Sequence, residues 1–187
     1  MADDRLANVL GAFALALTDE VEAATAGAAG HTGAGPAALV ALSDLLAGRS
    51  VDDLRRAVGL THSGGVRVVD RLVGDGLAER RPGADGRSVA LVLTPAGRRL
   101  AGQVRDARRQ TLERVLDVLD DRERAQLSAI LDKVVAGVAG VVERRLAARA
   151  AGHIPPGGWL CRLCDTVACE RSEGRCPTAN AAAGGKG

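Results

Sequence analysis

The spacing of apolar residues along the chain predicts mainly helical structure. From residue 3 to residue 25, apolar side chains recur at steps of three and four, which is the period of an amphipathic helix. Residues 27–35 are rich in glycine and break this pattern. A second helix is expected to begin at Pro36, which suits a first helical turn, and to end at Gly48. The apolar stripe of the first helix consists of Leu6, Val9, Leu10, Phe13, Leu17 and Val21.

Two short helices joined by a tight turn are predicted over residues 51–74. Ser50 and Asp53 have the spacing of a capping box, in which the hydroxyl and the carboxylate satisfy backbone N–H groups at the start of a helix. Gly59 ends that helix, and Thr61 can cap the next one. This arrangement is typical of a helix-turn-helix. Four apolar residues share one face of the second of these helices: Val66, Val69, Leu72 and Val73.

After Gly76 the pattern changes to extended structure. Residues 77–81 and 88–93 favour strands, and residues 82–86 between them are turn formers, so a β-hairpin is expected. Two long helices should follow. The first is capped by Thr94 and reaches about residue 119, and the second runs from the Asp120 cap to about residue 151. The expected fold class is mainly α with a small β-hairpin wing: a winged helix-turn-helix with long helices before and after it.

The first and last helices carry more apolar surface than packing on a small lobe requires. These stripes predict an intertwined homodimer, because twofold symmetry explains why they lie at both ends of the chain; a monomeric helical bundle is the alternative. The late stripe consists of Leu112, Val115, Leu116, Leu119, Leu127, Ile130, Leu131, Val134, Val138, Val141, Val142 and Leu146. The expected division is a dimerisation helix and hinge (1–35), a winged helix-turn-helix (36–100), dimerisation helices (101–151) and a linker with a cysteine-rich metal-binding tail (152–187).

Composition and charge fit this picture. The chain is 47% hydrophobic but only 1% aromatic, so its core must consist of Leu, Val and Ala, which favours helices. The net charge is only +2, yet residues 51–101 hold nine Arg against six acidic residues, whereas residues 1–50 hold two against six. The acidic first residues and the lack of a long apolar run predict a cytoplasmic protein that does not enter a membrane.

The middle of the chain resembles the MarR (multiple antibiotic resistance regulator) family. The stretch from Leu60 to Arg81, LTHSGGVRVVDRLVGDGLAERR, is similar to the family's recognition helix and following strand. The next residues are similar to its wing signature, R-x-x-x-D-x-R followed by L-T-x-x-G: Arg81, Asp85, Arg87, Leu93, Thr94 and Gly97. One departure is Ser63-Gly64-Gly65, where the family has bulkier residues. The resemblance implies a homodimeric transcriptional regulator, expected to be a repressor, that binds a palindromic operator in double-stranded DNA and can respond to a small-molecule effector.

The predicted recognition helix supplies the expected contacts with the major groove. A helix fits this groove, so exposed side chains near its start can reach base edges. The expected contacts are Thr61, His62, Ser63 and Arg67. Arg71 is expected at the phosphate edge, with an ion pair to Asp70 or Asp75 as the alternative. Gly64 and Gly65 would allow the backbone to approach the DNA closely.

The wing supplies the remaining expected contacts. An exposed guanidinium at Arg87 can enter a minor groove, whose negative potential attracts it. Asp85 is expected to orient an arginine, because phosphates repel a carboxylate. Arg80 and Arg81 are expected to contact phosphates. The alternative for all four is a solvated hairpin tip.

Four cysteines near the carboxyl terminus indicate a metal site. Cys161, Cys164, Cys169 and Cys176 have the spacing C-x2-C-x4-C-x6-C, and four thiolates match the ligand set of structural zinc. An iron-sulfur cluster is a second interpretation, since Cys176-Pro177 resembles the Cys-Pro ending of bacterial ferredoxin motifs, and redox-active thiols are a third. The tail could be a structural clip or a sensor of metal or redox state.

The sequence does not favour an enzyme. Thr61-His62-Ser63 is the one cluster that resembles a catalytic group, but neighbours along a helix point in different directions. The alternative to a sequence-specific regulator is a protein-interaction or architectural winged-helix module with a structural zinc tail.

Overall fold

Helices form most of the regular structure in the computed structural model, which describes residues 2–83, 89–147, 163–164, 166–168 and 170–184. The elements are α1 (Ala2–Ala29), α2 (Gly35–Asp44), α3 (Val51–Ala57), α4 (His62–Gly74), β1 (Ala78–Pro82), β2 (Val89–Leu93), α5 (Pro95–Leu116), α6 (Asp121–Ala147), the 3-10 turn η1 (Arg171–Glu173) and α7 (Pro177–Gly184). The predicted fold class, mainly α with one hairpin, is confirmed.

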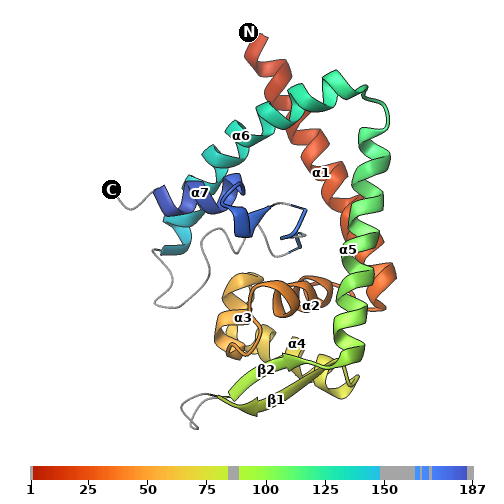
Figure 1. The fold of residues 1–187 in the computed structure, drawn as a ribbon, viewed down its shortest axis with the longest axis vertical. Helices are drawn as coiled ribbons and strands as arrows, with labels where there is room; N and C mark the ends of the chain where they lie inside the picture. The colour runs from red at the N-terminus through yellow and green to blue at the C-terminus, as the bar shows by residue number, and fades with distance from the viewer. Residues whose placement is uncertain (1, 84–88, 148–162, 165, 169, 185–187) are drawn as a thin grey trace.

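Helices α2, α3 and α4 and the hairpin form a lobe at the lower end of the molecule, from which α1 and α5 extend side by side (Figure 1). At the upper end α6 turns back from α5. Burying each large aliphatic side chain contributes about 1.5–3 kcal/mol relative to leaving it in water. The largest fully buried side chains of the lobe and its junction with α5 are aliphatic, as the composition requires: Leu39, Val40, Leu42, Leu46, Leu54, Val69, Leu72, Leu91 and Val104. Among the described residues, no helix is apolar over the length that crossing a membrane would take.

Side-chain caps define where the helices of the lobe begin. Ser50 Oγ accepts the N–H of Asp53, while the Asp53 carboxylate accepts the N–H of Ser50, so the predicted capping box is present at α3. Thr61 accepts the N–H of Gly64 at the start of α4, and Thr94 accepts the N–H of Gly97 at the start of α5. These caps satisfy donors that a helix leaves unpaired at its first turn, which is why local sequence located the helix starts correctly.

The hairpin pairs in antiparallel register, with Ala78 opposite Leu93 and Pro82 opposite Val89. A third segment, between α2 and α3, joins its far edge: the N–H of Gly48 donates to Leu91 O at 2.9 Å, and the N–H of Leu91 donates to Arg49 O at 2.9 Å. These bonds satisfy the outer edge of β2 and fix the hairpin to the lobe. The sequence did not predict this third segment, because two residues are too short for a periodic pattern.

The helices differ from the prediction at three places. α2 ends at Asp44 and not at the predicted Gly48, which instead pairs with Leu91 of β2. α1 continues through Gly27 to Ala29, although the sequence predicted its end near residue 25. Its last turns pack on the lobe, where Thr25 and Ala29 are buried, and this packing outweighs the roughly 1 kcal/mol that a helical glycine costs. The sequence did not predict α7, although Pro177 at its first turn and the alanines after it suit a short helix.

Candidate nucleic-acid interface

Helix α4 presents one side to the lobe and the other to solvent. Gly65, Val69 and Leu72 are buried, whereas Arg67 and Arg71 are exposed. Ser63 is also exposed, and its spacing of four residues from Arg67 and of eight from Arg71 places all three side chains along one stripe. Among the described residues, neither arginine has a carboxylate partner. This stripe therefore offers two cations and a hydroxyl to a ligand outside the lobe.

The start of α4 places the other predicted contacts at its exposed end. Thr61, His62 and Ser63 are all exposed. The Thr61 hydroxyl caps the helix through the Gly64 N–H at 3.1 Å and lies 3.4 Å from Ser63 Oγ. Thr61 thus has a structural role whether or not it also contacts DNA, whereas His62 and Ser63 lie open to solvent.

Gly65 has a role within the lobe that the sequence did not reveal. Its backbone was expected to approach DNA, but Gly65 is buried and faces α3. A β-carbon added there would lie 2.7 Å from Cβ of Arg55, closer than real Cβ atoms approach. The glycine therefore permits close packing of the two helices of the helix-turn-helix. Finding this required knowledge of how α3 crosses α4, which a local pattern does not contain.

The arginines of β1 lie in ion pairs. Arg80 Nη2 lies 2.5 Å from Asp70 Oδ1 of α4, and Arg81 Nη2 lies 2.8 Å from Glu79 Oε2. All four residues are exposed, so such pairs contribute only about 0–1 kcal/mol and can open toward a phosphate. The Arg80 pair links the hairpin to α4. Because Asp70 pairs with Arg80, the alternative of an Arg71–Asp70 pair does not occur.

The hairpin tip, residues 84–88, lies outside the described residues. It contains both Arg87, the predicted minor-groove contact, and Asp85, the residue predicted to orient an arginine. The strands on either side are paired as far as Pro82 and Val89. The roles of Arg87 and Asp85 therefore stay predictions.

His31 lies next to the end of α4 and was not among the predicted site residues. Its Nε2 is 3.5 Å from Asp75 Oδ2, and its side chain is only 10% exposed. Asp75 caps the carboxyl end of α4, so the contact joins the loop between α1 and α2 to the predicted recognition helix. The two residues are far apart in sequence, and no local signal could have paired them. Asp75 thus contacts His31. The second alternative for Arg71, an ion pair with Asp75, is therefore not seen.

The cysteine tail is described in part. Cys161 and Cys169 lie outside the described residues; Cys164 is half-buried and Cys176 is buried. The guanidinium Nη1 of Arg171 lies 4.0 Å from Cys176 Sγ. Within the described part of the chain, no three His, Cys, Asp or Glu side chains form a group that could hold a metal. The four-cysteine site thus stays a prediction, since it includes two residues outside this part.

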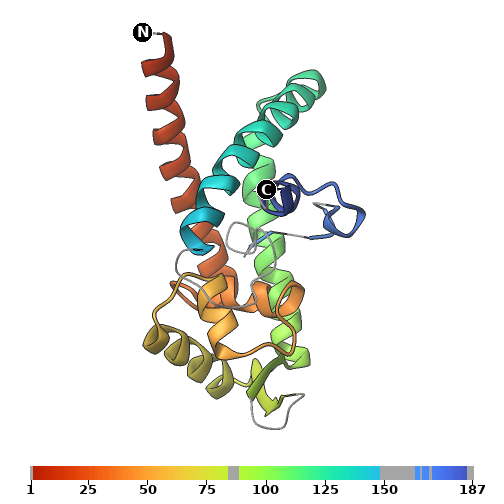
Figure 2. The ribbon, with the colours of Figure 1, turned by 90° about the vertical axis from the view of Figure 1, so that its left-hand side faces the viewer.

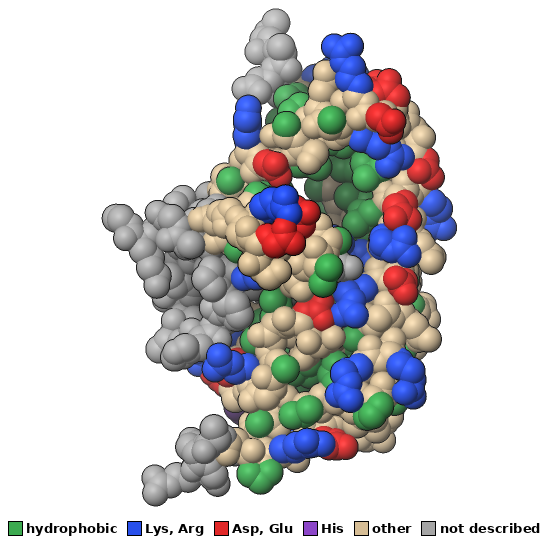
Figure 3. Space-filling model, in the orientation of Figure 1, with side chains coloured by type: hydrophobic (Ala, Val, Ile, Leu, Met, Phe, Trp, Pro, Cys, Tyr) green, Lys and Arg blue, Asp and Glu red, His purple; other side chains and the backbone are tan. Residues whose placement is uncertain are grey.

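Apolar side chains remain exposed on the two long helices farthest from the lobe. On α1 they are Leu6, Val9, Leu10, Phe13 and Leu15, and on α6 they are Ile130, Leu131, Val134 and Val138. The amino-terminal half of α1 extends alone beyond the lobe (Figure 2). The surface is hollowed between α5 and α6, where apolar side chains gather (Figure 3). Basic side chains lie on the lower lobe and also along α5 and at the upper end of this face.

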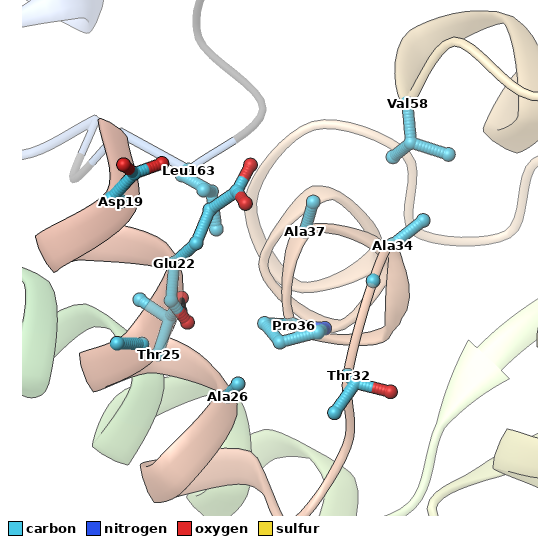
Figure 4. Close-up of a pocket in the computed structure, with 12 residues that line it drawn as sticks. Asp19, Glu22, Thr25, Ala26, Thr32, Ala34, Pro36, Ala37, Val58 and Leu163 are labelled. Atoms are coloured by element: carbon cyan, nitrogen blue, oxygen red, sulfur yellow. Dashed lines mark hydrogen bonds between the residues drawn. The ribbon is translucent and has the colours of Figure 1, made fainter. Parts of the chain in front are cut away.

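A cleft of about 520 Å³ separates the end of α1 from the start of α2 (Figure 4). Asp19 and Glu22 of α1 lie on one side of it, and Pro36 and Ala37 of α2 lie on the other. Leu163 of the cysteine tail completes its wall. Neither carboxylate has an ion-pair partner among the described residues.

A helix-turn-helix followed by an antiparallel hairpin on the same lobe defines the winged helix-turn-helix class. No family model matches the sequence, and no curated protein does. Solved structures do match. A MarR family protein of Mycobacterium tuberculosis is 28% identical, with 71% of this chain and 95% of that chain covered and a TM-score of 0.57.

The same Mycobacterium tuberculosis protein in complex with DNA matches at 26% identity and a TM-score of 0.57, over 69% of this chain and 96% of that chain. A MarR family protein of Bacillus stearothermophilus matches at 24% identity and a TM-score of 0.61, over 71% of this chain and 92% of that chain. The fold is therefore a MarR-like winged helix, as the resemblance of the sequence implied. These proteins are covered almost completely, whereas more than a quarter of this chain lies outside each match.

Proposed function

We propose that this protein is a sequence-specific DNA-binding transcriptional regulator of the MarR type and acts as a repressor. The observation that carries the proposal is the exposed stripe of Ser63, Arg67 and Arg71 on α4, next to a hairpin that also bears arginines. The match to a MarR family protein solved in complex with DNA supports it. An α-helix fits the major groove, and arginine is the side chain that most often recognises guanine there.

Each predicted contact has a distinct part in this proposal. Arg67 reads a base edge, and His62 and Ser63 lie beside it, near the helix start. Arg71 lies farther along the stripe and neutralises a phosphate. Arg80 and Arg81 contact phosphates once their exposed ion pairs open, and Arg87 enters the minor groove. Base contacts determine which sequence is bound, while phosphate contacts determine register and affinity.

The proposed functional unit is a homodimer on a palindromic operator. On α1, Leu6, Val9, Leu10 and Phe13 lie along one stripe, and with the exposed apolar residues of α6 they form an apolar surface that a second copy of the chain would cover. Two copies related by a twofold axis would present two α4 helices to successive major grooves. The operator is therefore expected to contain two inverted half-sites.

Selection from random DNA duplexes tests this function directly. The full chain is incubated with the pool, bound duplexes are recovered and sequenced, and affinity for the enriched duplex is measured by fluorescence anisotropy. We expect an inverted repeat to be enriched, with binding that weakens steeply as salt rises. Enrichment of no sequence would favour the protein-interaction or architectural module instead. Arg67→Ala should cost about 1–3 kcal/mol on the enriched duplex and relax the preference at one position of each half-site.

Arg87→Ala tests the wing. We expect it to weaken binding to the enriched duplex severely without changing the dimer, because it removes only the minor-groove contact. Arg109→Ala is a matched control, since Arg109 is an exposed arginine on α5 that pairs with Glu113, away from the lobe. Equal affinity of the Arg87 variant and the wild type would contradict the wing assignment.

We further propose that the four cysteines bind one zinc ion. Their number and the closely spaced C-x2-C pair support tetrahedral thiolate coordination. Anaerobic purification followed by metal analysis and a visible spectrum tests this. One zinc per chain in colourless protein is the expected result. A brown protein that contains iron and sulfide would show that the cysteines bind an iron-sulfur cluster instead of zinc. A metal-free protein would favour the interpretation as redox-active thiols.

A small-molecule effector would bind in the cleft between α1 and α2. The carboxylates of Asp19 and Glu22 beside apolar Ala and Pro side chains favour a cation with an apolar body. Thermal unfolding with benzylamine, and with benzoate as the anion of similar size, tests this. Benzylamine should raise the melting temperature more, and Glu22→Gln should reduce that difference. Equal effects of the two compounds would contradict the assignment.

A further inference from the structure

Leu163 of the cysteine tail packs into the body of the protein. It directly precedes Cys164 in sequence, is half-buried, and packs against the hydrophobic core of the lobe. It lines the cleft of about 520 Å³ between α1 and α2, and also a second cleft of about 230 Å³ between α1 and α5. Glu22 is the other residue common to both linings. Leu163 therefore lies where α1, α2 and α5 come together.

The junction that Leu163 occupies connects two parts of the proposed regulator. α1 carries apolar surface expected to meet the second copy, and α2 is the first helix of the lobe. Val58, which lines the larger cleft, caps the carboxyl end of α3, directly before the turn into α4. Figure 4 shows Leu163 beside Glu22, with Ala37 and Val58 on the far side of the opening. A side chain at this junction can influence how the lobe sits on α1.

The later part of the tail attaches to a different helix. α7 packs on α6, and at the start of α7 Cys176 and Thr178 are buried. Asn180 Nδ2 donates to Gly174 O at 2.6 Å, and Arg175 Nε lies 2.8 Å from Glu170 Oε2, so residues 170–180 form a compact unit. The described tail thus has two attachments, one at the lobe junction and one on α6, and cysteines lie next to both.

We propose that the cysteine tail is an intramolecular latch, in which Leu163 holds the junction of α1, α2 and α5 and passes the state of the cysteines to α4. A change of state at Cys164, the residue next to Leu163, would release Leu163 from the junction, and the contact that it makes between α1 and the lobe would then be lost. The latch itself depends only on packing; its effect on DNA rests on the proposed function.

Hydrogen exchange in the full chain tests the latch without DNA. Leu163→Asp should raise amide exchange at least threefold in the end of α1 and in α2, because a carboxylate would be placed against the hydrophobic core and next to the like charge of Glu22. Val167→Asp is the matched control, since Val167 is on the same tail but 82% exposed, and it should change neither segment. Leu163→Ala, a milder variant, should give a smaller rise in the same segments. Wild-type exchange in both Leu163 variants would overturn the latch.

DNA binding tests whether the latch carries a signal. The wild type is treated with EDTA and N-ethylmaleimide, which remove metal and alkylate the thiols, and its affinity for the selected duplex is measured. Treatment should weaken binding at least tenfold. Untreated Leu163→Asp should already bind the duplex about as weakly as the treated wild type. Treatment of this variant should change its affinity less than twofold, because the substitution and the treatment release the same contact. Additive effects would overturn the signalling role.

The two experiments separate the latch from the proposed function. If the wild type binds no DNA, the regulator proposal fails, and the exchange measurement still decides whether Leu163 holds the junction. If the wild type binds DNA but Leu163→Asp shows wild-type exchange and affinity, the latch fails and the regulator proposal stands.

Discussion

At the first turn of α5, Gly97 faces the carbonyl of Leu77 so closely that an added β-carbon would lie 2.0 Å from its oxygen. Thr94, three residues earlier, donates its hydroxyl to Gly76 O at 2.8 Å and its N–H to Leu77 O at 3.0 Å. The L-T-x-x-G motif therefore joins the end of α4, the hairpin and the start of α5. Hydrogen bonds and close packing within the chain therefore account for the threonine and the glycine of this motif.

Gly97→Ala should lower the free energy of unfolding by about 3 kcal/mol, because the new methyl group overlaps backbone that cannot move aside easily. Gly102→Ala on the same helix is the control. The nearest atom to its β-carbon is the end of the Arg105 side chain at 3.9 Å, so this variant should gain up to about 1 kcal/mol from helix propensity. Urea unfolding followed by circular dichroism measures both. Equal stabilities would contradict the role given to Gly97.

At the scale of elements, α4 illustrates how much of a functional helix is visible in sequence. Its cap, its buried face and its arginines follow from the 3.6-residue period and from Thr61. The pairing of Arg80 with Asp70 does not, because it depends on where the hairpin lies beside the helix. This pairing leaves Arg71 as the cation at the far end of the exposed stripe.

Arg71→Ala should lower the slope of log affinity against log salt concentration by about 0.9, the value expected for one lost phosphate contact. Preference among duplex sequences should hardly change. Anisotropy titrations of the selected duplex over a series of salt concentrations give the slope. Arg109→Ala on α5 should leave it unaltered. An unchanged slope for Arg71→Ala, or a change in sequence preference larger than for Arg67→Ala, would contradict the division of roles along α4.

At the scale of the whole molecule, the main feature is the apolar surface that a single chain leaves exposed on α1 and α6. The amino-terminal half of α1 extends beyond the lobe, and Phe13 near its middle is 48% exposed. Leu6, Val9 and Leu10 on the same helix are also about half exposed or more. In the proposed dimer a second copy would cover these side chains, so we expect the monomer to be the less stable form.

Phe13→Glu should weaken self-association about 100-fold, because it places a charge within the proposed contact between copies. Leu15→Glu is the control: Leu15 is 71% exposed on the same helix but lies outside the stripe of Leu6, Val9, Leu10 and Phe13. Sedimentation equilibrium or light scattering over a concentration series measures both. Dimers of wild-type strength for Phe13→Glu, or equal weakening by both variants, would argue against the proposed surface.

The sequence by itself determined the order and type of the elements up to α6, because caps, glycine turns and apolar periods are local signals that act within a few residues. It also located the exposed arginines of α4 and grouped the four cysteines. The extent of α1, the position of α7 on α6 and the use of Gly65 and Gly97 were decided only by tertiary structure. Contacts such as His31 with Asp75, or Leu163 at the junction of three helices, join residues far apart in the chain. Only the packed fold brings them together, because no short stretch of sequence contains both partners.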